Sequence, residues 1–305
     1  MRILIASLLV CSLVVVGGAQ SLKPRSEMLV STQWLAKHVN DPQVVILHVA
    51  VERKHYDEGH IPGARFVAMK DVVATRNGVL NELAVVADLQ KVFTALGIGE
   101  TARVVLYGEN FNLYAARVYF TLDYLGHGER AALLDGGLEK WKADKQPVSK
   151  DAVTPQSAAF TPRLHAGVKV EAPAVRDASW IAANTNTANV ALIDARPVKQ
   201  YEGEDAGGLA RGGHIPGAAS LYWMNHLASN ENPVLKPVTE LRKLFEAAGV
   251  KPSQTVMSYC RTGVQASHTY FVAKYLGYDV TMYDGSMSEW VALEGSEVVQ
   301  GKEKK

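Results

Sequence analysis

The chain contains one set of motifs twice, in the same order. Three motifs carry the repeat: Gly-His-Ile-Pro-Gly-Ala at 59–64 and 213–218, Tyr-Leu-Gly at 124–126 and 275–277, and Asp-Gly-Gly or Asp-Gly-Ser at 135–137 and 284–286. Several landmarks in register over so long a stretch indicate a duplicated domain rather than chance similarity. Hydrophobic residues make up 48% of 305 positions, enough for two cores of ordinary size.

Short apolar runs alternate with amphipathic stretches in each copy. The predicted buried strands are 44–47, 104–107 and 131–134 in the first copy, and 190–193, 255–258 and 280–283 in the second. Residues 83–96 and 113–125 have helical spacing of apolar side chains. This alternation predicts an α/β fold in which each copy is a parallel sheet with helices on both faces. We expect domains at 26–146 and 171–298, joined by a linker at 147–170 that lacks clear periodicity.

The first 19 residues have the pattern of a secretory signal peptide. Arg2 is followed by an uncharged stretch at 3–16 and by the small residues Gly17-Gly18-Ala19, after which we expect cleavage. About 14 apolar residues are fewer than the roughly 20 that span a bilayer, so the mature form should have no stable membrane span. An uncleaved anchor is the alternative. The sequence therefore predicts export, to a periplasm or the exterior.

The sequence offers no basis for a nucleic-acid partner or a metal site. The formal net charge is +1, and no basic run or stripe is present. No His, Cys or carboxylate cluster has the spacing of metal ligands, so no metal is expected.

Cys260 stands between a predicted strand and a predicted helix. The other cysteine, Cys11, lies in the expected signal, so the mature chain cannot form an internal disulfide. The turn after residue 258 and the helix expected from Ser267 should direct backbone N–H groups at the sulfur. Such surroundings can lower a cysteine pKa from about 8.5 to roughly 3.5 to 7.5. We therefore expect a nucleophilic thiolate, although a small buried hydrophobe is the alternative.

The first copy has no cysteine at the matching place. Aligning the two Tyr-Leu-Gly motifs puts Glu109 opposite Cys260. Chemistry is expected only in the second domain, with the first as a lid or wall.

With these motifs the chain resembles the tandem-domain rhodaneses, which include thiosulfate and 3-mercaptopyruvate sulfurtransferases. Tyr56 with residues 60–64, the Tyr-Asp-Gly-Ser at 283–286 with Glu289 and Trp290, and a six-residue loop after Cys260 carry the resemblance. It implies that Cys260 takes the outer sulfur of thiosulfate, a small anionic donor, and passes it to cyanide or a thiol, with no need for a metal or organic cofactor. The implied substrate-binding residues are Arg261, Thr262, Gly263, Val264, Gln265, Ala266 and Arg196.

The loop favours thiosulfate as the donor. In the family, Cys followed by Arg is typical of thiosulfate enzymes, and Arg261 fits that pattern. Thiosulfate enzymes carry Lys at the position of Thr262 and a second Arg at that of Gln200, two cations for which Lys199 or Arg211 could compensate. Arg196 could bind an anionic oxygen or pair with Asp194. Use of mercaptopyruvate and a non-catalytic persulfide carrier remain the alternatives, whereas Ala266 replaces the Arg that phosphatase loops require.

The other recurring residues are predicted to be structural. His60 and His214 should order loops, Trp141 and Trp290 should pack against the sheets, and Asp135 and Asp284 should cap the following helical turns.

Overall fold

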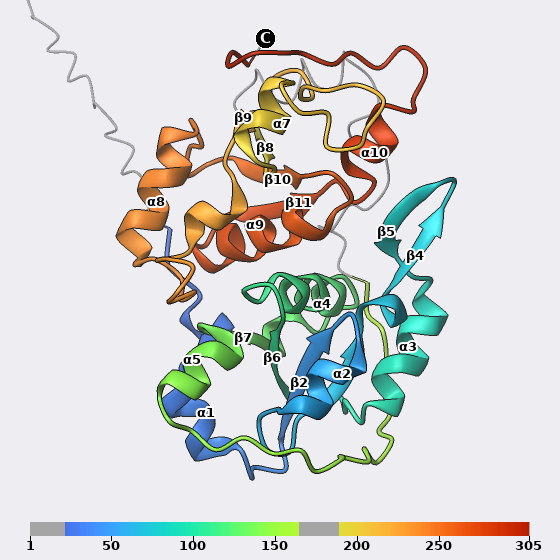
Figure 1. Ribbon diagram of the computed structural model, residues 1–305, viewed down its shortest axis with the longest axis vertical. Coiled ribbons are helices and arrows are strands. Elements are labelled where there is room, and N and C mark those ends of the chain that lie inside the picture. The colour runs from blue at the N-terminus through green and yellow to red at the C-terminus, as the bar shows by residue number, and fades with distance from the viewer. Residues whose placement is uncertain (1–21, 165–188, 305) are drawn as a thin grey trace, which may run out of the picture.

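The computed structural model describes residues 22–164 and 189–304, which form two α/β domains (Figure 1). The helices are α1 (Thr32–His38), α2 (Arg53–Glu58), α3 (Val86–Ala95), α4 (Leu113–Tyr124), α5 (Gly137–Ala143), α7 (Val198–Glu202), α8 (Val238–Ala247), α9 (Val264–Tyr275) and α10 (Ser286–Trp290). The strands are β1 (Leu29–Val30), β2 (Val44–Ala50), β3 (Arg65–Ala68), β4 (Val73–Arg76), β5 (Val79–Leu83), β6 (Arg103–Gly108), β7 (Ala131–Leu134), β8 (Val190–Asp194), β9 (Ala219–Ser220), β10 (Thr255–Tyr259) and β11 (Asp279–Met282).

Each domain is built on a parallel sheet, as predicted. The first sheet has the order β1-β7-β6-β2-β3, and the second has the order β11-β10-β8-β9. Apart from β1, the two orders match strand for strand, which confirms the duplication. Each sheet is covered by helices on both faces, because near-continuous apolar strands must be buried on both sides.

The domains meet through α4 and α9, which lie between the two sheets in Figure 1. Tyr119 packs edge-on against Phe271, and Phe120 packs in the same way against Tyr270. Because Tyr119-Phe120 and Tyr270-Phe271 are the corresponding pairs of the repeat, these contacts are reciprocal, as in an isologous interface. One continuous hydrophobic core therefore runs through both domains.

Ionic contacts reinforce this interface near its pseudo-twofold axis. Lys274 of α9 donates to both carboxylate oxygens of Asp123 on α4, at 2.6 and 2.5 Å, and all three atoms are buried. The Tyr270 hydroxyl donates to the same carboxylate at 2.5 Å. Asp123 and Lys274 occupy corresponding positions of the two helices, counted from the Tyr-Leu-Gly motifs. A buried charge needs such a partner, so the interface is specific as well as apolar.

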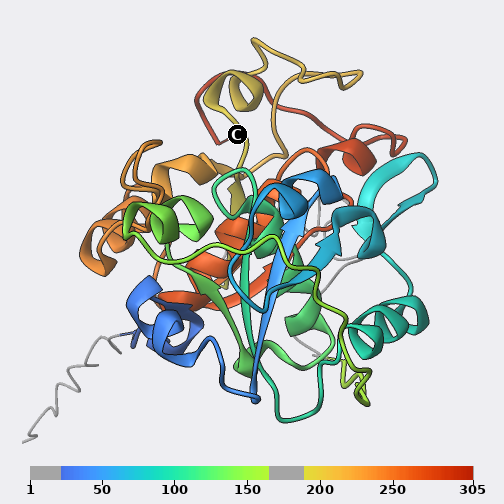
Figure 2. The ribbon, with the colours of Figure 1, turned by 60° about the horizontal axis from the view of Figure 1, so that its bottom comes forward.

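The segment after the first domain has no helix or strand up to residue 164, but it packs closely. Phe160 is 3% exposed and stacks at an angle on Phe93 of α3, 5.3 Å between ring centroids. The amide of Ala158 donates to the carbonyl of Thr94. Figure 2 shows this yellow-green segment crossing the first domain towards α3. The remainder of the predicted linker, 165–170, and the expected signal at 1–19 lie outside the described residues.

The recurring histidines and tryptophans have structural roles, as predicted. The His60 ring stacks on Tyr56 at 3.7 Å, and His214 stacks on Tyr201 at the same distance. Each histidine also bonds two backbone carbonyls through its ring nitrogens. Trp141 and Trp290 belong to the hydrophobic clusters on the outer faces of the sheets.

Within the described ranges, no helix is long and apolar enough to cross a bilayer.

Two histidines in the second domain should make the fold sensitive to acid. His226 and His268 are buried with their Nδ1 atoms 3.4 Å apart. Burial lowers the pKa of His268 to about 3, and burial followed by the repulsion of His268 lowers the pKa of His226 well below 6.5. The unfolded chain therefore takes up protons below about pH 6.5 that the folded chain does not, so stability falls as the pH falls. At pH 5 His268 alone should cost about 2 kcal/mol of unfolding free energy, and His226 should add to this loss.

Urea unfolding at pH 7 and pH 5 measures this effect. The loss of unfolding free energy between the two pH values should be smaller in His268→Gln than in the wild type, by about 2 kcal/mol. Equal losses of unfolding free energy in the wild type and His268→Gln would contradict this prediction.

Candidate active site

Cys260 directly follows β10, and α9 begins four residues later. Gly263 has φ +83° and precedes the first helical residue, Val264. A residue with a side chain is strained at this angle, and a Cβ there would lie 2.7 Å from an Asp284 oxygen. This glycine lets α9 begin at Val264, three residues before the predicted start at Ser267. The cysteine is therefore held in a short turn against the amino end of a 12-residue helix.

The Cys260 sulfur is directed at backbone N–H groups, as predicted, but its side chain is buried. The amides of Ala266, Thr262 and Gln265 act on the thiol and favour its ionised form. The residue is only 1% exposed, and burial is the larger effect, so it raises the pKa of the Cys260 thiol. The prediction of a lowered pKa is therefore wrong for this state of the protein, because removal from water disfavours the thiolate more than the amides favour it.

The pH dependence of reactions at this thiol should follow its raised pKa. Since the thiolate is the nucleophile, the rate at which iodoacetamide alkylates Cys260 should rise with pH through the neutral range. The rise should continue beyond about 8.5, the ordinary pKa of a cysteine thiol. A rate profile that is already flat from about pH 6 would contradict it and would show that the amides dominate.

The predicted loop residues surround the sulfur with different exposures. Arg261 is exposed, whereas Gly263 and Ala266 are buried. Thr262 is half-buried, and its hydroxyl accepts a hydrogen bond from Asn81 at 3.2 Å. Val264 and Gln265 are also half-buried. Arg261 is therefore the cation of the loop that is free to meet an incoming anion.

Arg196 forms the ion pair with Asp194 that sequence analysis gave as one of two alternatives. Its side chain is buried, and Nη2 lies 2.5 Å from Asp194 Oδ2, while Nε lies 3.0 Å from Oδ1. Nη2 also donates to the Gly213 carbonyl at 2.6 Å. The Arg196 guanidinium is thus paired with Asp194, and the expectation that it binds substrate directly is not supported. Arg211, one of the two cations expected to compensate for Thr262 and Gln200, is bonded to Val291 and Ser296 instead.

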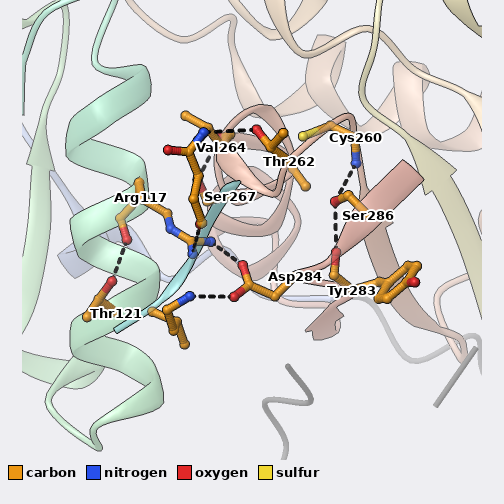
Figure 3. Close-up of polar contacts among 12 residues, drawn as sticks. Arg117, Thr121, Cys260, Thr262, Val264, Ser267, Tyr283, Asp284 and Ser286 are labelled. Atoms are coloured by element: carbon orange, nitrogen blue, oxygen red, sulfur yellow. Dashed lines mark hydrogen bonds and ion pairs between the residues drawn. The ribbon is translucent and has the colours of Figure 1, made fainter. Parts of the chain in front are cut away.

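Ser286 supports the cysteine from outside the loop. Its Oγ accepts a hydrogen bond from the Cys260 amide at 3.1 Å and donates to the Tyr283 carbonyl at 2.9 Å (Figure 3). The amide of Met287 donates to the Cys260 carbonyl at 3.0 Å. Sequence analysis treated residue 286 only as part of a motif, and its pairing with Cys260 has no sequence signal beyond that motif.

Asp284 joins the two domains at the site, and it does not cap the following helix as predicted. One oxygen accepts from Arg117 Nη1 at 2.5 Å, and the other accepts from the Leu83 amide at 2.7 Å. Arg117 also donates to the Asn81 carbonyl at 2.6 Å. Asp135, the corresponding residue, likewise does not cap its helix but accepts from the Leu235 amide of the other domain at 2.9 Å. The first domain is thus a structural part of the site, more than a lid or wall.

A hairpin that sequence analysis missed brings Asn81 and Leu83 to this point. Strands β4 and β5 are joined by Asn77 and Gly78, which have φ of +50° and +82°. Two such residues form the tight turn preferred in hairpins, so Asn-Gly at 77–78 was the available signal. Figure 1 shows the hairpin reaching from the first domain towards α10.

Comparison with known proteins identifies the fold family. A model of the rhodanese-like domain matches residues 31–144 and 177–293. The chain belongs to the rhodanese family. It is 32% identical over 287 residues to the "Sulfur carrier protein TtuD" of Thermus thermophilus, covering 91% of this chain and 98% of that protein. It is also 32% identical over 286 residues to the "Putative thiosulfate sulfurtransferase 1" of Mycobacterium bovis, covering 91% and 99%.

Solved structures share the rhodanese fold at lower identity. YnjE superposes with a TM-score of 0.78 at 24% identity, covering 92% of this chain and 70% of that one. The anaerobic ergothioneine biosynthesis enzyme of Chlorobium limicola superposes with a TM-score of 0.75 at 23% identity, covering 90% and 70%. These likenesses confirm the tandem architecture.

The first domain of this rhodanese has a longer loop at the place of the active loop. Tyr107 and Tyr259 are equivalent, because each hydroxyl accepts the amide of the Ile in the His-Ile-Pro motif. Counted from these strands, Gly108 lies opposite Cys260, whereas counting back from the helices gives Glu109. The first loop is one residue longer, so the predicted pairing of Glu109 with Cys260 holds only in the helix register.

Proposed function

We propose that this rhodanese transfers sulfane sulfur from thiosulfate to a thiol or cyanide through a Cys260 persulfide. The observation that carries the proposal is a lone thiol directed at the amides of Thr262, Gln265 and Ala266. The Cys260 thiolate would use a lone pair to bond the outer sulfur, while the thiosulfate S–S bond breaks and its electron pair leaves with sulfite. An acceptor then attacks the terminal sulfur, and the thiolate is restored.

The loop amides suit the intermediate better than the free thiol. A persulfide carries its negative charge on the terminal sulfur, which extends farther into the loop than the cysteine sulfur does. Fixed N–H groups stabilise such a charge as an oxyanion hole stabilises oxygen. Among the described residues, no group of His, Cys, Asp and Glu is arranged to hold a metal ion.

The charge at the loop supports an anionic donor. Arg261 is exposed and can pair with a sulfonate oxygen, which supports thiosulfate over an uncharged donor. The second candidate is a persulfide carrier that receives sulfur from a partner protein. Two features favour it: Arg196 is sequestered by Asp194, and the chain is similar to a protein named as a sulfur carrier.

Sulfite release separates the two functions. An enzyme supplied with thiosulfate and cyanide should release many equivalents of sulfite per Cys260 at steady state. A carrier should release at most one equivalent, or none. Mass spectrometry of the Cys260 peptide after thiosulfate treatment should show one added sulfur atom. Absence of that species together with absence of sulfite would contradict the thiosulfate reaction.

The proposed site of action is outside the cytoplasm. It rests on residues 1–19, whose sequence has the pattern of a cleavable signal. The mass of the mature N-terminus, measured on protein recovered from its native compartment, tests this proposal directly.

A further inference from the structure

A pocket of about 220 Å³ lies in the first domain, at the carboxyl ends of β2 and β6. In parallel α/β sheets this edge is where ligands bind. The second domain has Cys260 at the corresponding edge. The ionisable residues that line the pocket of the first domain are His48, His55, Glu58, Glu109, Glu139 and Lys142.

His48 is a buried lining residue of this pocket with an unused polar atom. The side chain is 2% exposed and lies between the rings of Tyr56 and Tyr107, and its Nδ1 has no hydrogen-bond partner among the described residues. A buried polar atom left unpaired is unfavourable, and a ligand that donates to it would supply the missing hydrogen bond. Burial, followed by the nearby His60 and His55, lowers the pKa of His48 to about 4. The imidazole is thus neutral at pH 7, and its Nδ1 can accept a hydrogen bond without repelling a cation.

The charge of the lining selects the sign of the ligand. Glu58, Glu109 and Glu139 contribute three carboxylates to the lining, and Lys142 contributes one ammonium group. Lys54 pairs with Glu58 at 3.7 Å, so the carboxylates still outnumber the ammonium groups. The sign is opposite to that of the catalytic loop, where Arg261 is exposed. Because the described residues include no group arranged to hold a metal ion, the fitting cation is an organic one.

We propose that this pocket of the first domain binds a small organic ammonium ion. Its N–H groups would donate to His48 Nδ1 and to the surrounding carboxylates, and its carbon atoms would lie against Leu138. The site is separate from Cys260 and does not depend on sulfur transfer. Duplication therefore left two sites at corresponding edges, one for an anion and one for a cation.

The test uses the full chain, with ethylammonium as the probe. The imidazole NMR signals of His48, assigned with His48→Gln, should shift and saturate in the millimolar range on titration. Acetate, of similar size and opposite charge, should cause no saturable shift. Tetramethylammonium, which has no N–H, should bind at least about tenfold more weakly, since one good charged hydrogen bond is worth about 1.4 kcal/mol or more.

Variants locate the binding in the pocket. In Glu109→Gln/Glu139→Gln the dissociation constant for ethylammonium should rise at least about tenfold. Glu100→Gln, outside the pocket in the same domain, should not change it, and thermal melting shows that both proteins are folded. The proposal is overturned if His48 shows no saturable shift, if acetate or tetramethylammonium binds as well as ethylammonium, or if the double variant binds like the wild type.

Discussion

Cys260→Ser should abolish sulfur transfer while leaving the fold intact. Serine is nearly the same size, and its hydroxyl oxygen can accept from the loop amides that face the sulfur. It cannot, however, form a persulfide under these conditions, so turnover should fall by at least about a thousandfold. Sulfite release with thiosulfate and cyanide measures the loss, and circular dichroism with thermal melting measures the fold.

The variant also distinguishes the role of the thiol from that of the loop. Its thiosulfate-treated peptide should carry no added sulfur, whereas the wild-type peptide should carry one. Retention of more than a few per cent of the sulfite release in Cys260→Ser would exclude the persulfide mechanism.

Arg117→Met should both destabilise the protein and impair the site in the other domain. The substitution leaves the buried Asp284 carboxylate with one remaining donor, the Leu83 amide. Removing one partner of a buried ion pair typically costs about 3 to 5 kcal/mol of unfolding free energy. Asp284 is two residues from Ser286, which holds the Cys260 amide, so persulfide formation should slow as well. Urea unfolding and single-turnover sulfite release measure the two effects.

The duplication supplies a matched control. Asp135→Asn removes the corresponding carboxylate, which accepts one amide hydrogen bond from Leu235 and, among the described residues, has no ion pair like that of Asp284. Its cost should be near 1 kcal/mol, with sulfur transfer unchanged. Arg117→Lys keeps the charge and should fall between the wild type and Arg117→Met. Equal losses in Arg117→Met and Asp135→Asn would contradict the special role of the Arg117–Asp284 pair.

The sequence predicted those features that depend on short-range patterns. The strands and α4 appear within a few residues of their predicted bounds, because buried parallel strands and amphipathic helices leave periodic signals. The position of Cys260 between strand and helix followed from the same patterns. Its burial did not, since exposure depends on what the rest of the fold places around the loop.

Contacts between distant parts of the chain were the main omission. Arg117 lies in the predicted helix at 113–125, where a charge among apolar residues signals a buried partner, but no local pattern names Asp284 as that partner. Asp284 was assigned to a local helix cap because capping is the usual role of such a residue. Arg196 shows the reverse case. Its partner, Asp194, is two residues away, and the structure confirms the local alternative.

The Asp123–Lys274 pair shows how the two copies have come to depend on each other. Two first halves meeting through the same surface would bring Asp123 against Asp123, and two second halves would bring Lys274 against Lys274, with like charges buried in either case. Only the pairing of a first half with a second half brings opposite charges together at this position. Neither present half can therefore pair with a copy of itself through this face without burying two like charges. Covalent linkage of the two halves supplies the partner that each one requires.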